Sequence, residues 1–112
     1  MFPAQNRLRN EKDIKTLFAK GRSVFDLTIG MRFAKNRLPL SRFTVVVGTK
    51  VSKRAVVRNR IKRRIRGIIE KQLLSVAPGF DVLILVKKEA IDQTHKQLSE
   101  QIDRLFKKAK LV

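Results

Sequence analysis

The feature that most constrains this chain is a run of fourteen residues, 53–66, that contains eight cations and no acid. With the periodicity of an α-helix, the apolar residues in and after this run gather on one side, which predicts an amphipathic helix. These apolar positions are Val57, Ile61, Ile65 and Ile68, with Ile69 and Leu73 at the edge. We therefore expect a helix at about 55–74 that is apolar on its inner face and cationic on its outer face.

The cationic face of this helix is unusual because its charges do not alternate in sign. Ordinary solvated helix surfaces mix acids and bases, so that residues four apart attract each other. Here Arg54, Arg58, Lys62 and Arg66 form a ladder of like charges that repel at each step. Arginine outnumbers lysine six to two in this run, and a guanidinium group donates in a fork that fits phosphate oxygens. A nucleic acid is therefore the expected counterion.

The order of residues along this helix matches a known pattern. The chain resembles the bacterial ribonuclease P protein subunit, the small basic partner of a catalytic RNA, in the string Lys53-Arg54-Ala55-Val56-x-Arg58-Asn59-Arg60-x-Lys62-Arg63-x-x-Arg66. A lone Arg-Asn-Arg triplet would be weak support, but the whole string in mid-chain is specific. The layout of the flanking segments agrees from Arg7 to Leu105, so the resemblance covers nearly the whole chain.

Charge is concentrated in one part of the chain. The 112 residues are 43% hydrophobic and carry a net charge of +18. Thirteen Lys or Arg and no Asp or Glu lie between residues 27 and 69, whereas the other 69 residues carry only +5. Such asymmetry is the electrostatic pattern of a protein that binds RNA or DNA. The length predicts one domain, 1–112, and residues 1–9 are predicted to be an extended basic arm.

The composition also bears on the cellular compartment of the protein. The chain contains no cysteine, which excludes disulfides and thiolate metal sites. No apolar run approaches the ~18 residues of a membrane span, and residues 1–6 lack the apolar stretch of a signal peptide. We expect a cytoplasmic protein with no membrane partner.

The first half of the chain predicts one helix and two strands. Asn10 is a candidate cap and Gly21 a candidate end for a helix at about 11–20. Apolar and polar residues then alternate from Phe25 to Phe33, which predicts a strand with one wet face. A more buried strand is predicted at Phe43–Val51, and the two strands are expected to pair antiparallel.

The second half predicts a central strand and a last helix. Phe80–Val86 is continuously apolar, as in the middle of a sheet, and Thr94 with Gln97 forms a capping box for the final helix. The fold class is therefore α+β: a small mixed sheet with flanking helices, in the order helix, two or three strands, helix, strand, helix. A βαβ crossover is almost always right-handed. The resemblance implies the rare left-handed version, in a sandwich topology shared with some ribosomal domains, and we adopt it.

Side chains for protein-based nuclease chemistry are scarce. Acid–base ribonucleases need two suitable groups at the phosphate, usually including His, and the chain has only His95, expected to face solvent. Metal-dependent nucleases need three or four converging carboxylates, and residues 27–69 contain none. We therefore predict no catalytic residue in this chain. The resemblance agrees, because in ribonuclease P the RNA carries the chemistry and holds the Mg²⁺ ions.

The resemblance implies two RNA-binding surfaces and no obligatory protein partner. The protein would bind the catalytic RNA and the 5′ leader of precursor tRNA, and so assist endonucleolytic removal of the leader to give the mature tRNA 5′ end. The predicted contacts with the catalytic RNA are Lys53, Arg54, Arg58, Asn59, Arg60, Lys62, Arg63 and Arg66. The predicted leader cleft, between the first helix and the sheet, contains Ile14, Phe18, Arg32 and Lys87.

Two alternatives stay open at this stage. Phe18 either stacks on a base of the leader or packs in the core. The family often has aromatic residues at the positions of Ile14 and Arg32, whereas this chain has neither and contains no Tyr or Trp. The competing function is a structural RNA-binding protein, ribosomal or involved in assembly, since fold alone does not fix function.

Overall fold

The structure, a computed structural model, describes residues 3–112 and is built on one four-stranded sheet. The strands are β1 (Arg22–Phe25), β2 (Ile29–Lys35), β3 (Arg42–Val46) and β4 (Phe80–Val86). Their spatial order is β1-β2-β4-β3. β4 pairs antiparallel with β2 and parallel with β3. The sheet is therefore mixed, as predicted.

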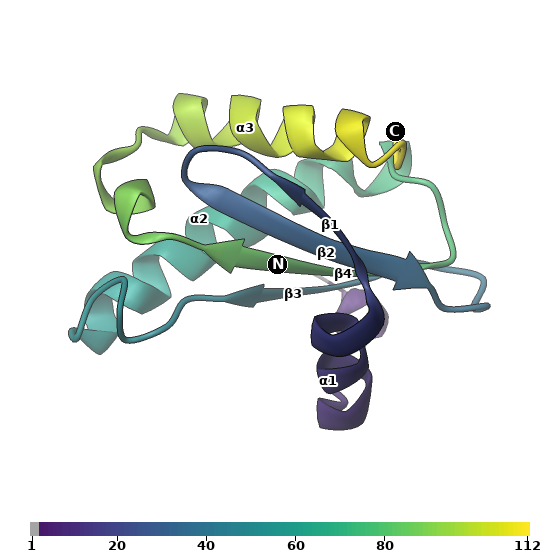
Figure 1. Ribbon diagram of the computed structural model, residues 1–112. Helices are drawn as coiled ribbons and strands as arrows, with labels where there is room; N and C mark the ends of the chain where they lie inside the picture. Colours follow the sequence, from purple (N-terminus) through teal and green to yellow (C-terminus); the bar gives the residue numbers. More distant parts are fainter. Residues whose placement is uncertain (1–2) are drawn as a thin grey trace.

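Helices cover both faces of this sheet unequally. The long helices are α1 (Glu11–Lys20), α2 (Ala55–Gln72) and α3 (His95–Lys108). Short 3₁₀ turns span Ala4–Asn6, Leu73–Ser75 and Lys88–Asp92. Figure 1 shows α2 and α3 on one side of the sheet and α1 projecting from the other side. The predicted α+β class and the order of elements are confirmed, with the optional third strand present before α2.

The predicted single strand at 25–33 is wrong, because the chain turns back within it. β1 and β2 form a hairpin with Phe25 opposite Gly30. Asp26 closes the turn: its N–H donates to the Ile29 carbonyl at 2.8 Å, and its Oδ1 accepts from the Leu27 N–H at 2.7 Å. Leu27, which continues the alternating pattern, is 82% exposed at the tip of the hairpin.

The predicted antiparallel pair between 25–33 and 43–51 is also wrong, since β4 lies between β2 and β3. Val82, Leu83 and Ile84 of β4 are fully buried, because this strand is paired along both edges and covered on both faces of the sheet. The prediction of a central strand at 80–86 is thereby confirmed. β3 itself ends at Val46, five residues earlier than predicted.

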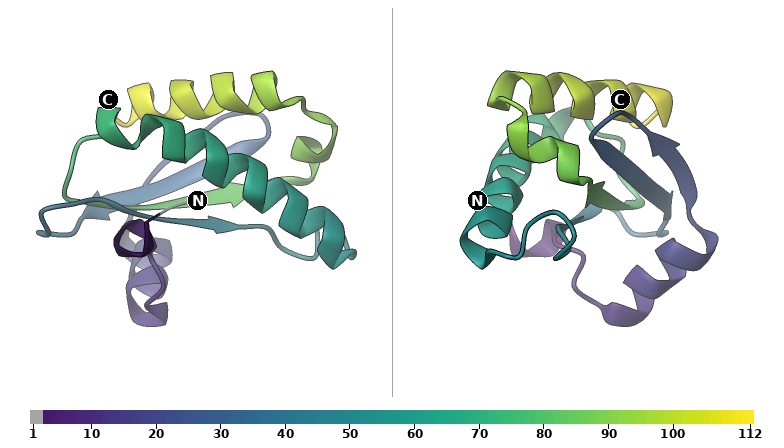
Figure 2. Two further views of the ribbon diagram at one scale, coloured as in Figure 1. Left: turned by 180° about the vertical axis from the view of Figure 1, so that it is seen from behind. Right: turned by 60° about the vertical axis from the view of Figure 1, so that its left-hand side comes forward.

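The connection from β3 through α2 to β4 has the rare handedness. Figure 2 (left) views the sheet from the side of α2, where the chain leaves β3, crosses in front of the sheet and enters β4. When the two parallel strands are turned to point upward, β4 lies to the left of β3. The crossover is therefore left-handed.

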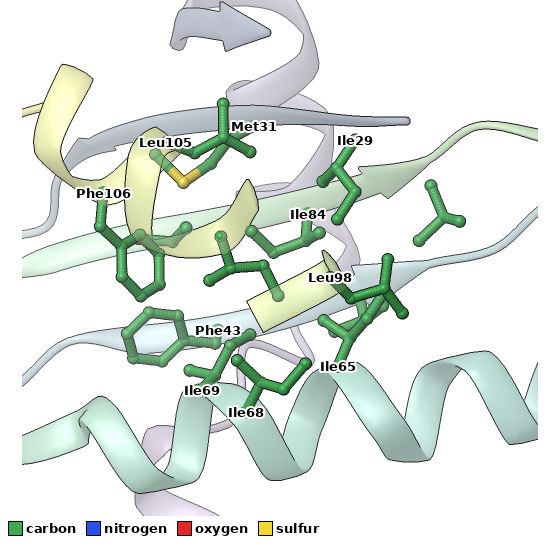
Figure 3. Close-up of a cluster of buried hydrophobic side chains, with 14 of the residues drawn as sticks. Ile29, Met31, Phe43, Ile65, Ile68, Ile69, Ile84, Leu98, Leu105 and Phe106 are labelled. Atoms are coloured by element: carbon green, nitrogen blue, oxygen red, sulfur yellow. The ribbon is translucent and has the colours of Figure 1, made fainter. Parts of the chain in front are cut away.

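The main core lies between the sheet and the two helices α2 and α3. Figure 3 shows isoleucines of α2 and residues of α3 meeting side chains of the strands. The predicted inner face of α2 is confirmed by its buried residues Ile61, Ile65, Ile68 and Ile69. A smaller cluster of Leu8, Leu17 and Leu83 lies under α1 on the opposite face. Because α1 covers only part of that face, the rest of it is available for binding.

The predicted helix caps are present in α1 and α3. Asn10 Oδ1 accepts from the N–H groups of Lys12 and Asp13 at 2.9 and 3.3 Å. Thr94 and Gln97 form the reciprocal capping box. Such caps each contribute about 1 kcal/mol to stability.

The N-terminal arm is less extended than predicted. Ala4–Asn6 form a 3₁₀ turn, and the Leu8 N–H then donates to the Phe43 carbonyl at 2.8 Å. This bond docks the arm beside β3. Residues 1–2 of the predicted arm lie outside the described residues.

Candidate nucleic-acid interface

The N-terminal end of α2 is arranged to attract anions. The first N–H groups of a helix lack partners one turn earlier and carry the positive end of the helix dipole, and most helices place a capping oxygen or an acid beside them. Here the Arg54 N–H donates to the Ser52 hydroxyl at 3.2 Å. In α2 the N-cap is Arg54, whose side chain makes no cap hydrogen bond, and the first turn contains no acid. A cationic residue at this position is unfavourable for the isolated helix, but it suits an end that binds phosphate.

Four of the predicted RNA contacts lie around one hollow on the outer face of α2. This hollow, of about 440 Å³, is lined by Val56, Asn59, Lys62, Arg63 and Arg66. The helical spacing of three and four residues brings these side chains together. Cations and an amide around an open surface give donors for phosphate oxygens without a competing acid.

The other predicted contacts have separate positions. Lys53, Arg54 and Arg60 are exposed but do not line this hollow. Arg58 is partly buried, and its Nη1 donates to the Ser52 carbonyl at 2.9 Å. Arg58 therefore holds the loop that leads into α2, in addition to carrying charge.

Arg66 also connects α2 to a second hollow that the sequence analysis missed. This hollow, of about 380 Å³, is lined by Arg7, Leu8, Arg9, Ile14, Phe43, Thr44 and Arg66. Among the described residues, the buried Nε of Arg7 has no hydrogen-bond partner. A buried N–H of a guanidinium group is costly to leave unpaired. An anion held between Arg7, Arg9 and Arg66 would satisfy it.

The signal for this second hollow was present in the sequence only as two arginines on the arm. Arg7 and Arg9 reach Arg66 because the arm docks on β3 through Leu8. That docking depends on contacts between segments far apart in the chain. Charge alone could not place the two arginines in the site.

The predicted leader cleft is partly assembled on the open face of the sheet. Phe18 is 42% exposed and belongs to neither core cluster of the described residues. Arg32 lies beside it: the guanidinium carbon is 5.9 Å from the ring centroid, and Nη1 donates to the Phe18 carbonyl at 3.0 Å. The core-packing alternative for Phe18 is therefore wrong, while its role in stacking stays a prediction.

Ile14 and Lys87 lie apart from this pair. Ile14 is one helical turn before Phe18 and lines the hollow with Arg7 and Arg66 instead. Lys87 follows β4, where its Nζ donates to the Asp26 carbonyl at 3.3 Å. The four predicted residues thus mark a stretch of surface and not one closed pocket.

An ion-pair network fixes α1 against the sheet. Arg42 of β3 donates to both carboxylate oxygens of Asp81 at 2.8 and 2.7 Å, and to Asp13 of α1 at 3.2 Å. The hydrogen bonds to Asp81 raise the pKa of Arg42, against the opposing effect of burial, and Asp13 adds to the rise. This network neutralises two acids near the basic surface and sets the position of α1 over β3 and β4.

Two features are absent from residues 3–112: a group of metal-ligating side chains and a membrane-spanning helix. Within residues 3–112, no three His, Cys, Asp or Glu side chains lie close enough to hold a metal ion. His95 is exposed in the first turn of α3. No helix in the same range has the length and apolar character needed to cross a bilayer.

These features define a class of protein: a small basic α+β domain whose arginine-rich helix and open sheet face are suited to nucleic acid.

Comparison with known proteins identifies the family. The model of the Ribonuclease P family matches residues 2–110. The ribonuclease P protein component of Synechocystis sp. is 34% identical over 112 residues, covering 99% of this chain and 90% of that protein. The corresponding protein of Pseudanabaena sp. is 34% identical over 115 residues, covering 100% and 97%. The chain therefore belongs to the ribonuclease P protein family.

Solved structures agree with this assignment. A mutant of the Staphylococcus aureus RNase P protein with defective mRNA degradation activity superposes with a TM-score of 0.88 at 26% identity, covering 96% of this chain and 91% of that one. The RNase P protein of Thermotoga maritima in complex with 1-(4-fluorophenyl)-2-thiourea gives a TM-score of 0.83 at 28% identity, covering 90% and 97%. The fold predicted from the signature helix is confirmed.

Proposed function

We propose that this chain is the protein subunit of a ribonuclease P, which binds the catalytic RNA of the enzyme and the 5′ leader of precursor tRNA. In this role it assists endonucleolytic removal of the leader to give the mature 5′ end of the tRNA. Membership of the family and the names of its relatives support the RNA-processing role. The expected cytoplasmic location belongs to the same proposal.

One observation supports binding of the catalytic RNA: the cations of α2 and those of the N-terminal arm form a continuous surface around Arg66. Arg66 lines both hollows, one with Arg63 and Lys62 and the other with Arg7 and Arg9. Like charges so close together repel unless a polyanion lies across them. RNA neutralises them with phosphates and releases its own counterions, which favours binding at low salt. The predicted contacts at Lys53, Arg54 and Arg60 extend this surface toward the N-terminal end of α2.

The open sheet face supports the proposal for the leader. Phe18 presents an exposed ring with a cation beside it, as do many proteins that bind single-stranded nucleic acid. Stacking is tolerant of base identity because every base has a π face. Such a surface suits a substrate class whose leaders differ in sequence.

Catalysis and metal binding are assigned to the RNA in this proposal. Among the described residues, no three His, Cys, Asp or Glu side chains are grouped closely enough to hold a metal ion. The proposal assigns Mg²⁺ mainly to the RNA partner. This chain binds and orients the two RNAs. It also lowers the repulsion between their phosphates.

The test is reconstitution of the holoenzyme with a ribonuclease P RNA. Phe18→Ala is expected to weaken binding of precursor tRNA about tenfold, because one stacked base contributes about 1–3 kcal/mol, and to leave binding of mature tRNA unchanged. Leu74→Ala is the matched control, since Leu74 is fully exposed and lies in the 3₁₀ turn that follows α2. Equal loss for precursor and mature tRNA, or no loss for either, would contradict the leader site.

A further inference from the structure

The open face of the sheet carries a second exposed aromatic ring, Phe25. This residue is 52% exposed and ends β1, where it pairs with Gly30 of β2. A Cβ atom added at Gly30 would lie 3.0 Å from Cδ1 and 3.1 Å from Cε1 of Phe25. The ring therefore lies against the backbone of β2, in space that only a glycine leaves free.

A cation flanks this ring, as in the pair of Phe18 and Arg32. The Nζ of Lys87 is 5.4 Å from the centroid of Phe25, compared with 5.9 Å between Arg32 and the ring of Phe18. Gly30 and Arg32 are alternate residues of β2, so they share one face and lie about 7 Å apart along the strand. The two aromatic–cation pairs are separate, but both lie on the same open face, at positions two residues apart along β2.

The hairpin that carries Phe25 is held in place by α3. Arg104 Nε contacts Asp26 Oδ2 at 2.9 Å, and Lys108 Nζ donates to the Phe25 carbonyl at 3.2 Å. The Lys87 ammonium also donates to the Asp26 carbonyl. About half of the surface of Phe25 stays exposed to water despite this support. A ring that is fixed but exposed is preorganised for binding, because little conformational entropy remains to be lost.

The surface beside this ring favours a single-stranded polyanion as the occupant. A hollow of about 430 Å³ adjoins Lys87 and is also lined by Lys50, Lys88, Val46 and Leu85, with no acid in its lining. The apolar side chains of this hollow suit the bases of a nucleic acid, and the lysines around it suit the phosphates. Asp26, the nearest acid of the hairpin, is engaged by Arg104.

We propose that Phe25, with Lys87, is a second base-stacking platform that continues the leader track from Phe18 across the sheet. This inference rests on the proposed binding of the leader. It assigns a ribonucleotide of the single-stranded leader to a residue of β1, beyond the cleft between α1 and the sheet. An aromatic ring supplied by β1 also provides the stacking that Arg32 of β2 lacks.

The test uses the reconstituted holoenzyme and precursor tRNAs whose leaders are lengthened one nucleotide at a time. Phe25→Ala is expected to weaken binding about tenfold for long leaders, the loss of one stacked base, and to have no effect on the shortest leaders. Phe25→Leu is expected to behave as the Ala variant, because it keeps the apolar packing of the hairpin but not the ring. Leu27→Ala, at the exposed tip of the same hairpin, is the matched control and is expected to bind as the unaltered protein.

Abasic substitution in the leader locates the contact. At one position, removal of the base should weaken binding to the unaltered protein about tenfold and should not weaken binding to the Phe25→Ala variant further. The second platform is wrong if the affinity of the Phe25→Ala variant rises with leader length as much as that of the unaltered protein. It is also wrong if Phe25→Leu binds long leaders with full affinity. In both cases the leader site at Phe18 stands. If the unaltered protein is insensitive to leader length, both proposals fail.

Discussion

α2 and α3 pack on the same face of the sheet, yet their outer faces are built on different principles. α2 contains seven Lys or Arg and one Glu, whereas α3 contains four Lys or Arg and two acids. α3 begins with a complete capping box, while α2 begins with an arginine whose side chain caps nothing. Both helices bury their apolar faces in the common core.

The difference separates a helix that follows the usual rules for stability from one that departs from them. α3 follows the usual rules for a stable helix: capped at its start, with cations near its end. α2 departs from these rules only outside its buried positions, since its buried isoleucines are as regular as the apolar residues of α3. Departures confined to the outer face of a helix are expected at a functional site.

The largest expected effect comes from reversing one charge on each helix. Arg66→Glu is expected to weaken binding of the catalytic RNA at least tenfold, because it removes one cation from both hollows and adds a repulsive charge. Lys107→Glu makes the same change of charge on the exposed surface of α3 and should alter RNA affinity less than threefold. Equal losses in a filter-binding or fluorescence titration would mean that overall charge, and not the face of α2, binds the RNA.

A smaller effect is expected from removing the cap of α3. Thr94→Ala should lower the free energy of unfolding by about 1 kcal/mol, because the Gln97 N–H loses its acceptor. RNA affinity should not change. Thr16→Ala is the control, since the exposed Thr16 hydroxyl donates within α1 and caps no helix end. Urea denaturation measures both variants, and a loss of RNA affinity in Thr94→Ala would show that α3 takes part in binding.

The smallest effect is expected at Gly67, inside α2. A glycine in a helix costs about 0.5–1 kcal/mol relative to alanine, and a Cβ added here meets no atom within 4 Å. Gly67→Ala should therefore raise the free energy of unfolding by roughly that amount in thermal or urea denaturation. Unchanged RNA affinity is expected. If the variant is more stable but binds RNA less well, the RNA backbone approaches α2 at this position.

Local signals in the sequence were sufficient to predict the helices, because periodicity and caps are encoded within a few residues. The inner face of α2, the cap at Asn10 and the capping box at Thr94 are all confirmed. The strand boundaries were harder. Leu27 continued the alternating pattern through the hairpin turn, so β1 and β2 were predicted as one strand.

The arrangement of the candidate site depends on contacts between distant segments. β4 enters the sheet between β2 and β3, which local pattern cannot reveal. Arg9 joins Arg66 only because the arm docks beside β3, and Phe25 lies near Lys87 only because β1 folds back on β2. The sequence therefore predicted the cationic face of α2 but not the residues that extend it.

The most direct measurement is the salt dependence of RNA binding by the isolated protein. If about 6–8 phosphates are neutralised, log affinity should fall against log salt with a slope near −4 to −6. Replacing both Arg63 and Arg66 by Gln should reduce the magnitude of that slope by about 1.4. RNA binding that is absent at low salt, or a slope that the double replacement leaves unchanged, would contradict the proposal that the outer face of α2 binds RNA.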